Sequence, residues 1–208
     1  MIYQKSFHYK FKNDLNESNY FVNQTNYFAF NNLIYNKSNL LFLYGPKKSG
    51  KSYLAQIWLK KNDAIQLKNN FELILDIKKN VLIDNLSLFE EEKVFYIVNN
   101  CLLNKVKILI TSNYKINELD FKLNDLSSRL KTFSNLEINQ PDDEMLFAVL
   151  TKLLIDKQFI IKSEEIFNYI LRRVDRSYEG VYKIVNKLDI LSLEKKRQLT
   201  IPLIKEII

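Results

Sequence analysis

The sequence has only one cysteine and one histidine among its 208 residues. The single thiol, Cys101, excludes an internal disulfide, and the lone His8 excludes most metal sites and catalytic triads, because these need several such side chains. Both scarcities fit a reducing cytosol, so we expect a cytoplasmic protein. No apolar run approaches the length of a transmembrane helix, and Lys5, His8 and Lys10 interrupt any signal-peptide pattern, so we expect no membrane partner.

The overall composition bounds the size of the core and the kind of partner. Hydrophobic residues make up 47% of the chain, which is ample for a packed core and excludes a disordered protein. A length of 208 residues suits one medium domain, or one domain with a small satellite. The formal net charge of +7 permits an acidic partner such as nucleic acid, but it is equally compatible with lysines that cover solvent-exposed faces.

A phosphate-binding signature begins at residue 45, in a chain with only three glycines. Its residues match the P-loop pattern G-x-x-x-x-G-K-[ST]: Gly45, Pro46, Lys47, Lys48, Ser49, Gly50, Lys51 and Ser52. The flanking segments predict a buried strand at 40–44 and a helix at 52–61, which disfavours a chance turn. The loop N–H groups and the positive end of the helix would cradle phosphates. Lys51 would reach the β and γ phosphates, and Ser52 would bind Mg²⁺.

Four more short apolar segments predict strands, at 64–67, 81–84, 107–112 and 136–138. Apolar residues at helical spacing predict helices at 26–34, 90–103 and 123–131, while residues 71–77 are ambiguous with a helical turn slightly favoured. Strands that alternate with helices indicate an α/β fold. We expect a parallel five-stranded sheet with helices on both faces.

After Pro141 the pattern becomes wholly helical. We expect helices at 142–156, 163–173, 177–192 and 200–208, the last with Thr200 as its N-cap and Pro202 in its first turn. The chain then divides into an N-terminal tail at 1–19, an α/β nucleotide-binding core at 20–140 and a small helical lid at 141–208. Without a Gly/Ser-rich linker, core and lid are expected to pack directly.

Asp84, at the end of the 81–84 strand, is the candidate carboxylate for Mg²⁺. P-loop proteins take such an acid from a second strand, and the carboxyl ends of parallel strands face the ligand crevice. The alternative is a strand-end cap. Asn85 follows, where an ATPase usually has a carboxylate that activates water. An amide cannot accept that proton, so general-base catalysis, which typically contributes ~10²–10⁴ in rate, is missing at this position. We therefore expect weak ATPase activity at most.

Three further polar residues are candidates for the site. Asn113 follows the 107–112 strand and could sense the γ-phosphate or hold the attacking water, or it could simply form a turn. Arg129 lies on a short helix and by default would be a solvated surface residue. Arg176 could reach over the phosphates from the lid, or pair with Asp175.

The combination of P-loop, strand-end acid, polar strand end, Ser-Arg helix and lid arginine resembles the layout of an AAA+ module. Within that superfamily it resembles the branch of the bacterial initiator DnaA, and within the branch the Hda family of DnaA-homologous regulators. The matching segments run through nearly the whole chain from Tyr20 on: Tyr20-Phe21-Val22 with Asn26 and Ala29, Ile83-Asp84-Asn85, Asp125-Leu126-Ser127-Ser128-Arg129-Leu130, Val174-Asp175-Arg176 and Leu199-Thr200-Ile201-Pro202-Leu203-Ile204-Lys205-Glu206-Ile207.

This resemblance implies roles for individual residues. ADP or ATP would bind with Mg²⁺, its base packed beside Tyr20, Phe21 and Val22. Asn113 would be the first sensor and Arg176 the second. Arg129 would be an arginine finger that acts in trans on ATP bound by DnaA.

The resemblance also implies partners. Family members act on the DnaA initiator and associate through an N-terminal peptide with the DNA polymerase III sliding clamp, the β subunit, so DNA would be met indirectly through the clamp. Gln4, Ser6 and Phe7 stand at the matching positions, although aromatic residues at a terminus can instead tuck against their own domain. AAA+ modules often bind head to tail, so a homo-oligomer is also compatible.

Three hypotheses of function follow. The first is a nucleotide-loaded regulator that, with the loaded clamp, stimulates hydrolysis of DnaA-bound ATP and suppresses re-initiation. The second is a short DnaA-like or helicase-loader-like ATPase, and the third is a nucleic-acid adaptor that uses the basic lid. Asn85 favours the first, as does the expectation that no helix-turn-helix module for reading DNA follows Ile208.

Overall fold

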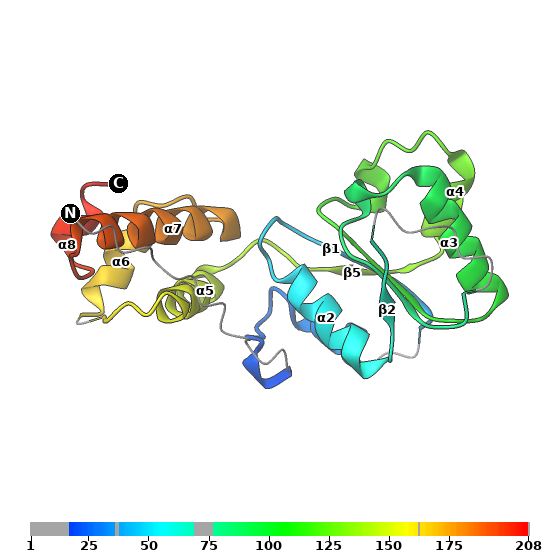
Figure 1. Cartoon of the computed structure of the whole chain (residues 1–208), viewed down its shortest axis with the longest axis horizontal. Helices are drawn as coiled ribbons and strands as arrows, with labels where there is room; N and C mark the ends of the chain where they lie inside the picture. The colour runs from blue at the N-terminus through cyan, green and yellow to red at the C-terminus, as the bar shows by residue number, and fades with distance from the viewer. Residues whose placement is uncertain (1–16, 36–37, 69–76, 162, 208) are drawn as a thin grey trace, which may run out of the picture.

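Five parallel strands form one sheet at the centre of the N-terminal part of the chain (Figure 1). The computed structural model describes residues 17–35, 38–68, 77–161 and 163–207. The strands are β1 (Leu40–Tyr44), β2 (Ile65–Gln66), β3 (Val81–Ile83), β4 (Ile108–Ser112) and β5 (Ser134–Glu137), in the order β2-β3-β4-β1-β5. The P-loop strand β1 therefore lies between β4 and β5, so that Tyr44 is opposite Ser112 on one side and Glu137 on the other. The predicted parallel α/β sheet is confirmed.

Helices cover both faces of this sheet because its central strands are apolar on both faces. On one face, Leu41 and Leu43 of β1 pack in a buried cluster with residues of α1 (Tyr27–Tyr35) and α2 (Lys51–Lys61). On the other face, Phe42 packs in a second cluster with residues of α3 (Glu91–Leu103) and α4 (Asn124–Leu130). Side chains alternate along a strand, so β1 contributes to both cores at once. Short 3₁₀ helices lie at Glu17–Asn19 (η1), Leu86–Leu88 (η2) and Ile116–Glu118 (η3).

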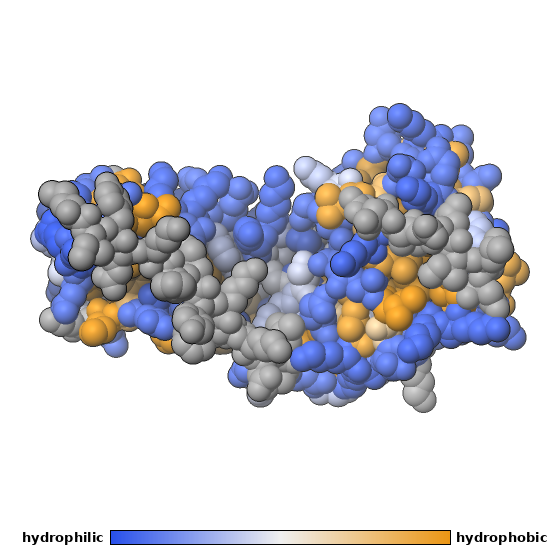
Figure 2. Space-filling view, viewed as in Figure 1, coloured by the Kyte–Doolittle hydropathy of each residue, from blue (hydrophilic) through white to orange (hydrophobic). Residues whose placement is uncertain are grey.

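The C-terminal part is a helical bundle with its own core. It consists of α5 (Asp143–Asp156), α6 (Glu165–Leu171), α7 (Tyr178–Lys195) and α8 (Ile201–Ile204). Their apolar faces share a buried cluster that includes Leu150, Ile170 and Leu188. Figure 1 shows the bundle beside the sheet and joined to it by the segment after β5. Figure 2 shows a group of apolar residues on the drawn face of the sheet-containing part, surrounded by hydrophilic residues.

Two residues of the bundle are buried in the core of the sheet part. Met145 of α5 and Tyr178 of α7 belong to the same buried cluster as Leu136 and Ile138, next to the P-loop strand. The bundle is also fixed by hydrogen bonds to the segment before α1, where Asn23 and Gln24 donate to the carboxylate of Asp142. The two parts thus pack directly on one another, and the space between them is bordered by side chains from both.

Some elements differ from the sequence-based expectation. β5 begins at Ser134, two residues before the expected strand, and β2 has only two residues. Thr200 occupies the N-cap position of α8, but its side chain makes no capping hydrogen bond, and α8 ends at Ile204. Of the ambiguous segment 71–77 the structure describes only Ile77, which is buried, and residues 1–16 also lie outside the described residues. None of the helices in the described ranges has the length and apolar character needed to span a bilayer.

Candidate functional site

The P-loop forms a tight turn between β1 and α2 that depends on its two glycines. Gly50 has a φ of 90°, a conformation that L-residues rarely adopt, and it is the N-cap of α2. A Cβ atom at Gly45 would lie 2.5 Å from the carbonyl oxygen of Ile138. Glycine at both positions therefore lets the loop curl tightly against the end of β5 and leaves the start of α2 facing the cavity.

Lys51, the first residue of α2, is buried against this loop. Its Nζ donates hydrogen bonds to the carbonyl oxygens of Gly45 at 2.8 Å and Pro46 at 2.6 Å. Burial lowers the pKa of Lys51 to about 8, although the nearby Asp84 carboxylate opposes the shift. Within the described residues the ammonium donates only to these neutral carbonyl oxygens. An anionic phosphate would be a stronger acceptor.

Asp84 lies directly after β3 and faces the same loop. Its Oδ1 accepts hydrogen bonds from Ser52 Oγ at 3.1 Å and from Thr111 Oγ1 at 2.7 Å. A hydroxyl and a carboxylate are ligands that Mg²⁺ accepts together with phosphate oxygens and water, so this pair fits a magnesium ion. In the part of the chain that the structure describes, no cluster of three or more His, Cys, Asp or Glu residues forms a metal site by itself.

Thr111 is the functional contact that sequence reasoning did not single out. Its hydroxyl donates to Asp84 and accepts a hydrogen bond from the backbone N–H of Asn85 at 2.7 Å. Asn85 has a φ of 68°, and its Oδ1 accepts from Ser87 Oγ at 2.8 Å. The sequence located Thr111 at the strand end but gave no reason to prefer it over Asn113, because that preference depends on which strand lies beside β3.

Two adjoining cavities meet at the P-loop. The first has a volume of about 390 Å³ and a polar lining, made up of residues 47–53, Asp84, Asn85, Thr111, Ser112, Asn113 and Tyr182. The second has a volume of about 460 Å³ and lies between the sheet part and the bundle. Because they share Lys48, Ser49, Gly50, Tyr53 and Tyr182, they form one elongated cleft with a polar end and an aromatic end.

The aromatic end contains the three residues expected beside a base. Tyr20, Phe21 and Val22 line the second cavity together with Met145 and Tyr178 of the bundle. The Tyr20 ring stacks on Tyr53, with centroids 5.7 Å apart, and burial raises the pKa of its phenol. A flat ring could enter here against aromatic and apolar walls.

The segment that carries these three residues is held by Asn26. Its side chain donates to the carbonyl oxygen of Phe21 at 2.9 Å and accepts from the backbone N–H of Asn23 at 3.0 Å. This explains the position of an asparagine that the sequence marked only as part of a resemblance.

The bundle reaches the cleft through tyrosine and lysine side chains. Lys48 of the P-loop lies 5.3 Å from the ring centroid of Tyr182, and Lys152 of α5 lies 4.7 Å from that of Tyr53. Both pairs cross from one part of the molecule to the other, so closure of the cleft is supported by cation–π contacts.

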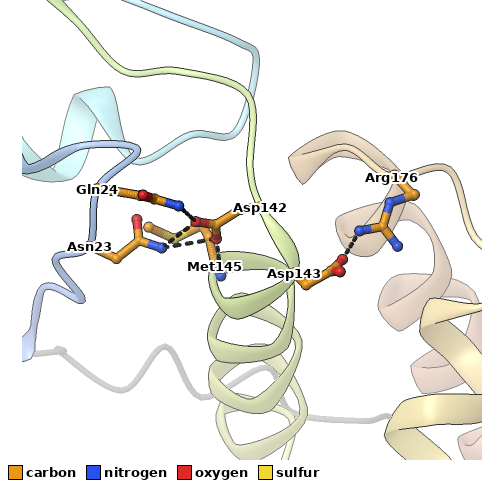
Figure 3. A network of polar contacts seen from close by, with 6 residues as sticks. All are labelled: Asn23, Gln24, Asp142, Asp143, Met145 and Arg176. Atoms are coloured by element: carbon orange, nitrogen blue, oxygen red, sulfur yellow. Dashed lines mark hydrogen bonds and ion pairs between the residues drawn. The ribbon is translucent and has the colours of Figure 1, made fainter.

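Arg176 precedes α7 and does not line either cavity. Its guanidinium forms an ion pair with Asp143 in the first turn of α5, and both side chains are exposed (Figure 3). The structure therefore does not bring Arg176 to the phosphate end, and its carboxylate partner is Asp143 and not Asp175.

Arg129 lies on α4 and is exposed. Leu126 and Leu130 anchor the helix in the core, which directs the polar face of α4 outward. Neither cavity of the cleft includes Arg129, and within the described residues its guanidinium has no hydrogen bond or ion pair. Gln4, Ser6 and Phe7, the expected clamp peptide, lie outside the described residues.

Comparison with known proteins shows a similarity to replication initiators and their relatives. Residues 143–208 match the family model described as "Hda, lid domain". The chain is 26% identical to the chromosomal replication initiator protein DnaA of Buchnera aphidicola, over 89% of this chain and 50% of that protein. Its fold matches domain III of Thermotoga maritima DnaA with a TM-score of 0.74 at 18% identity, covering 92% of this chain and 94% of that one. The chain is therefore DnaA-like in sequence and in its AAA+ fold, and its C-terminal part matches an Hda lid domain.

Other matches to this DnaA-like protein agree in fold and in length. An uncharacterized protein of Haemophilus influenzae is 26% identical over 88% of the chain and 91% of its own length. AMPPCP-bound DnaA from Aquifex aeolicus matches with a TM-score of 0.63 at 17% identity, over 87% of this chain and 68% of that one. The chain spans about half the length of the Buchnera initiator, whereas it is nearly coextensive with the Haemophilus relative.

Proposed function

We propose that this protein is a nucleotide-binding regulator of chromosomal replication initiation that stimulates hydrolysis of ATP bound to DnaA. It does so through an arginine finger in trans, together with the sliding clamp on DNA. In this proposal residues 20–140 are the nucleotide-binding core and 141–208 the lid. The tail, 1–19, contacts the clamp through Gln4, Ser6 and Phe7.

The cleft supports binding of ADP or ATP. Its polar end offers loop N–H groups, Lys51, and the Ser52–Asp84 pair for Mg²⁺, and its aromatic end offers Tyr20 against Tyr53. The Aquifex DnaA that shares this fold binds AMPPCP, an ATP analogue. Bound Mg²⁺ would neutralise charge on the phosphates, while Lys51 orients them and the tyrosines exclude water from the base.

The surroundings of Asp84 support slow hydrolysis by the chain itself. Asn85 follows Asp84, and its amide oxygen accepts a hydrogen bond from Ser87. An amide has no basic site for the proton of an attacking water, so the usual help of a general base is absent at this position. A protein that keeps its nucleotide can serve as a stable regulator.

The position of Arg129 is the observation that carries the proposal. It is exposed on α4, it is absent from the lining of its own cleft, and in the described part of the chain it has no counter-ion. A guanidinium held on a core-anchored helix without a partner fits insertion into another protein's site. In known GTPases such a finger in trans is worth roughly 10³–10⁵ in rate.

The test is hydrolysis of radiolabelled ATP bound to DnaA, measured with this protein and DNA-loaded clamp. Wild-type protein is expected to accelerate conversion to ADP, and Arg129→Ala to lose that acceleration while it still binds nucleotide. Arg172→Ala removes an exposed arginine of the lid and serves as the matched control, expected to behave as wild type.

Three outcomes would each contradict a part of the proposal. Arg129→Ala that stimulates DnaA as well as Arg172→Ala would exclude the finger. Rapid steady-state ATP turnover by the isolated chain would instead favour the alternative function, a short DnaA-like or loader-like ATPase. Deletion of residues 1–16 that leaves stimulation by loaded clamp unchanged would exclude the clamp contact.

A further inference from the structure

A third pocket, separate from the nucleotide cleft, opens beside the end of α4. It has a volume of about 470 Å³ and is lined by Tyr44, Lys115, Ile116, Asn117, Lys131 and Asn135. Its residues come from β1, the segment around η3, the C-terminus of α4 and β5. None of them lines either cavity of the cleft.

Most of the charges around this pocket are already matched. Lys115 forms an ion pair with Glu137 at 3.3 Å, and its Nζ lies 5.8 Å from the centroid of the Tyr44 ring. The Tyr44 hydroxyl donates to Glu137 at 3.0 Å, and Glu118 accepts from the backbone N–H of Lys115 at 3.1 Å. Burial and the Glu137 carboxylate raise the pKa of Tyr44 to about 12, so the phenol stays protonated.

Lys131 is the cation that remains unmatched. It is exposed, and among the residues that the structure describes its ammonium has no ion pair or hydrogen bond. Its backbone is nevertheless fixed, because Lys131 is the C-cap of α4, its N–H bonds to the carbonyl oxygens of α4, and the neighbouring Leu130 and Phe133 are buried. The Asn117 side chain is likewise unpaired within the described residues and offers amide donors beside it.

Lys131 also follows Arg129 by two residues on the same turn. The Thr132 hydroxyl donates to the carbonyl oxygen of Arg129 at 2.7 Å, which ties the turn together. A protein that brings its nucleotide to Arg129 must therefore place its own surface close to Lys131.

We propose that this pocket receives one carboxylate side chain of the protein whose nucleotide Arg129 reaches. The inference rests on the proposed function and adds a docking contact to it. One unmatched ammonium with amide donors suits a single carboxylate, and the buried Ile116 gives the pocket an apolar wall for its methylene groups. A nucleic acid is disfavoured, since Glu118 and Glu137 cancel the charge of Lys115 and a polyanion needs a continuous basic surface.

The test titrates this protein against ATP-loaded DnaA with DNA-loaded clamp and separates the half-maximal concentration from the plateau rate. Lys131→Ala is expected to raise the half-maximal concentration about fivefold to tenfold, because one charge-assisted hydrogen bond is lost. The plateau rate should not change. Lys131→Arg retains the charge and should restore most of the affinity. Lys187→Ala, an exposed lysine of α7, is the charge-matched control and should change nothing.

The outcomes separate this inference from the proposed function. If wild-type protein stimulates DnaA and Lys131→Ala has the same half-maximal concentration as Lys187→Ala, the docking contact is excluded. The arginine finger is not affected by that result. If wild-type protein gives no stimulation, both fail together. If Lys131→Ala weakens binding of a labelled single-stranded oligonucleotide while the DnaA titration is unchanged, the pocket serves nucleic acid and the inference is overturned.

Discussion

Thr111 of β4 donates a hydrogen bond from its Oγ1 to Oδ1 of Asp84 at 2.7 Å. The same hydroxyl oxygen accepts from the backbone N–H of Asn85, and Thr111 is almost completely buried. One side chain therefore fixes both the candidate magnesium carboxylate and the backbone of the residue that follows it. This link exists because β3 and β4 are neighbours in the sheet, with Ile83 opposite Ile110.

Replacing Thr111 by Val tests this link. Val has nearly the same shape as Thr, but it leaves the partly buried N–H of Asn85 without its partner. We therefore expect the free energy of unfolding to fall by ~1–3 kcal/mol. Asp84 also loses a donor that orients it, so Mg²⁺ should enhance nucleotide affinity less than in wild type. Denaturant titration and calorimetry with and without Mg²⁺ measure both effects. Thr151→Val, which removes only a bond to the preceding turn of α5, is the control.

The low pKa of Lys51 predicts that nucleotide affinity depends on pH. Without ligand the ammonium loses its proton near pH 8, whereas bound phosphate favours the charged form. Affinity should therefore fall as pH rises above about 8, by at most about tenfold per unit, with uptake of a proton on binding. Calorimetry in two buffers of different ionisation heat detects that proton. Lys51→Ala should abolish affinity; unchanged binding by this variant would refute the P-loop assignment.

The same shift has the opposite effect on the unliganded fold. Between about pH 8 and the ordinary value of 10.5, the unfolded chain holds a proton on Lys51 that the folded chain lacks. The contribution of this group to the free energy of unfolding therefore rises with pH across that window. The free energy of unfolding of the unliganded protein, minus that of Lys51→Ala, should therefore rise between about pH 8 and pH 10.5.

Asp142 caps α5 and connects the lid to the core, so its loss should weaken both the helix end and the contact between the two parts. It caps α5 by accepting from the N–H of Met145 at 2.8 Å, and it accepts from Asn23 and Gln24 (Figure 3). Asp142→Ala should cost about 1 kcal/mol from the cap alone. Limited proteolysis should cut the variant between core and lid faster than Asp120→Ala, an exposed carboxylate of the core.

Acid should mimic that substitution. The backbone hydrogen bond from Met145 and the amide of Gln24 hold the pKa of Asp142 below its ordinary value of 3.8. Its contribution to the free energy of unfolding is therefore complete above the ordinary pKa of 3.8. It is lost as the pH falls through the lowered pKa of the folded state. A difference between wild type and Asp142→Ala that persists unchanged into strong acid would contradict this.

The Arg176–Asp143 ion pair gives a test of the lid arginine. If Arg176 moves to the phosphates when nucleotide binds, it must first leave Asp143. Asp143→Asn should then raise nucleotide affinity, by no more than about fivefold because an exposed ion pair is worth ~0–1 kcal/mol. Arg176→Ala should lower it. Equal dissociation constants for both variants and wild type would remove Arg176 from the site.

Much of the site could be predicted because its residues are adjacent in sequence. The P-loop needs glycine where the backbone turns tightly, and residues 45–52 supply the loop, the ammonium and the hydroxyl in one local unit. Asp84 was predicted from the rule that strand ends face the crevice, which needs only the position of the strand. Short apolar runs between helices likewise determined the parallel sheet.

Only the tertiary structure decided which distant side chains meet. Thr111 is the partner of Asp84 because β3 and β4 are neighbours, and Arg176 pairs with Asp143 because α5 and α7 pack together. Glu137 pairs with Lys115, whereas Lys131 has no ion pair among the residues that the structure describes. Such pairings depend on strand order and helix packing, which sequence periodicity does not encode. The sequence alone thus specified the local phosphate-binding loop. The fold determined which charged side chains are paired within the described residues and which are left to contact a partner.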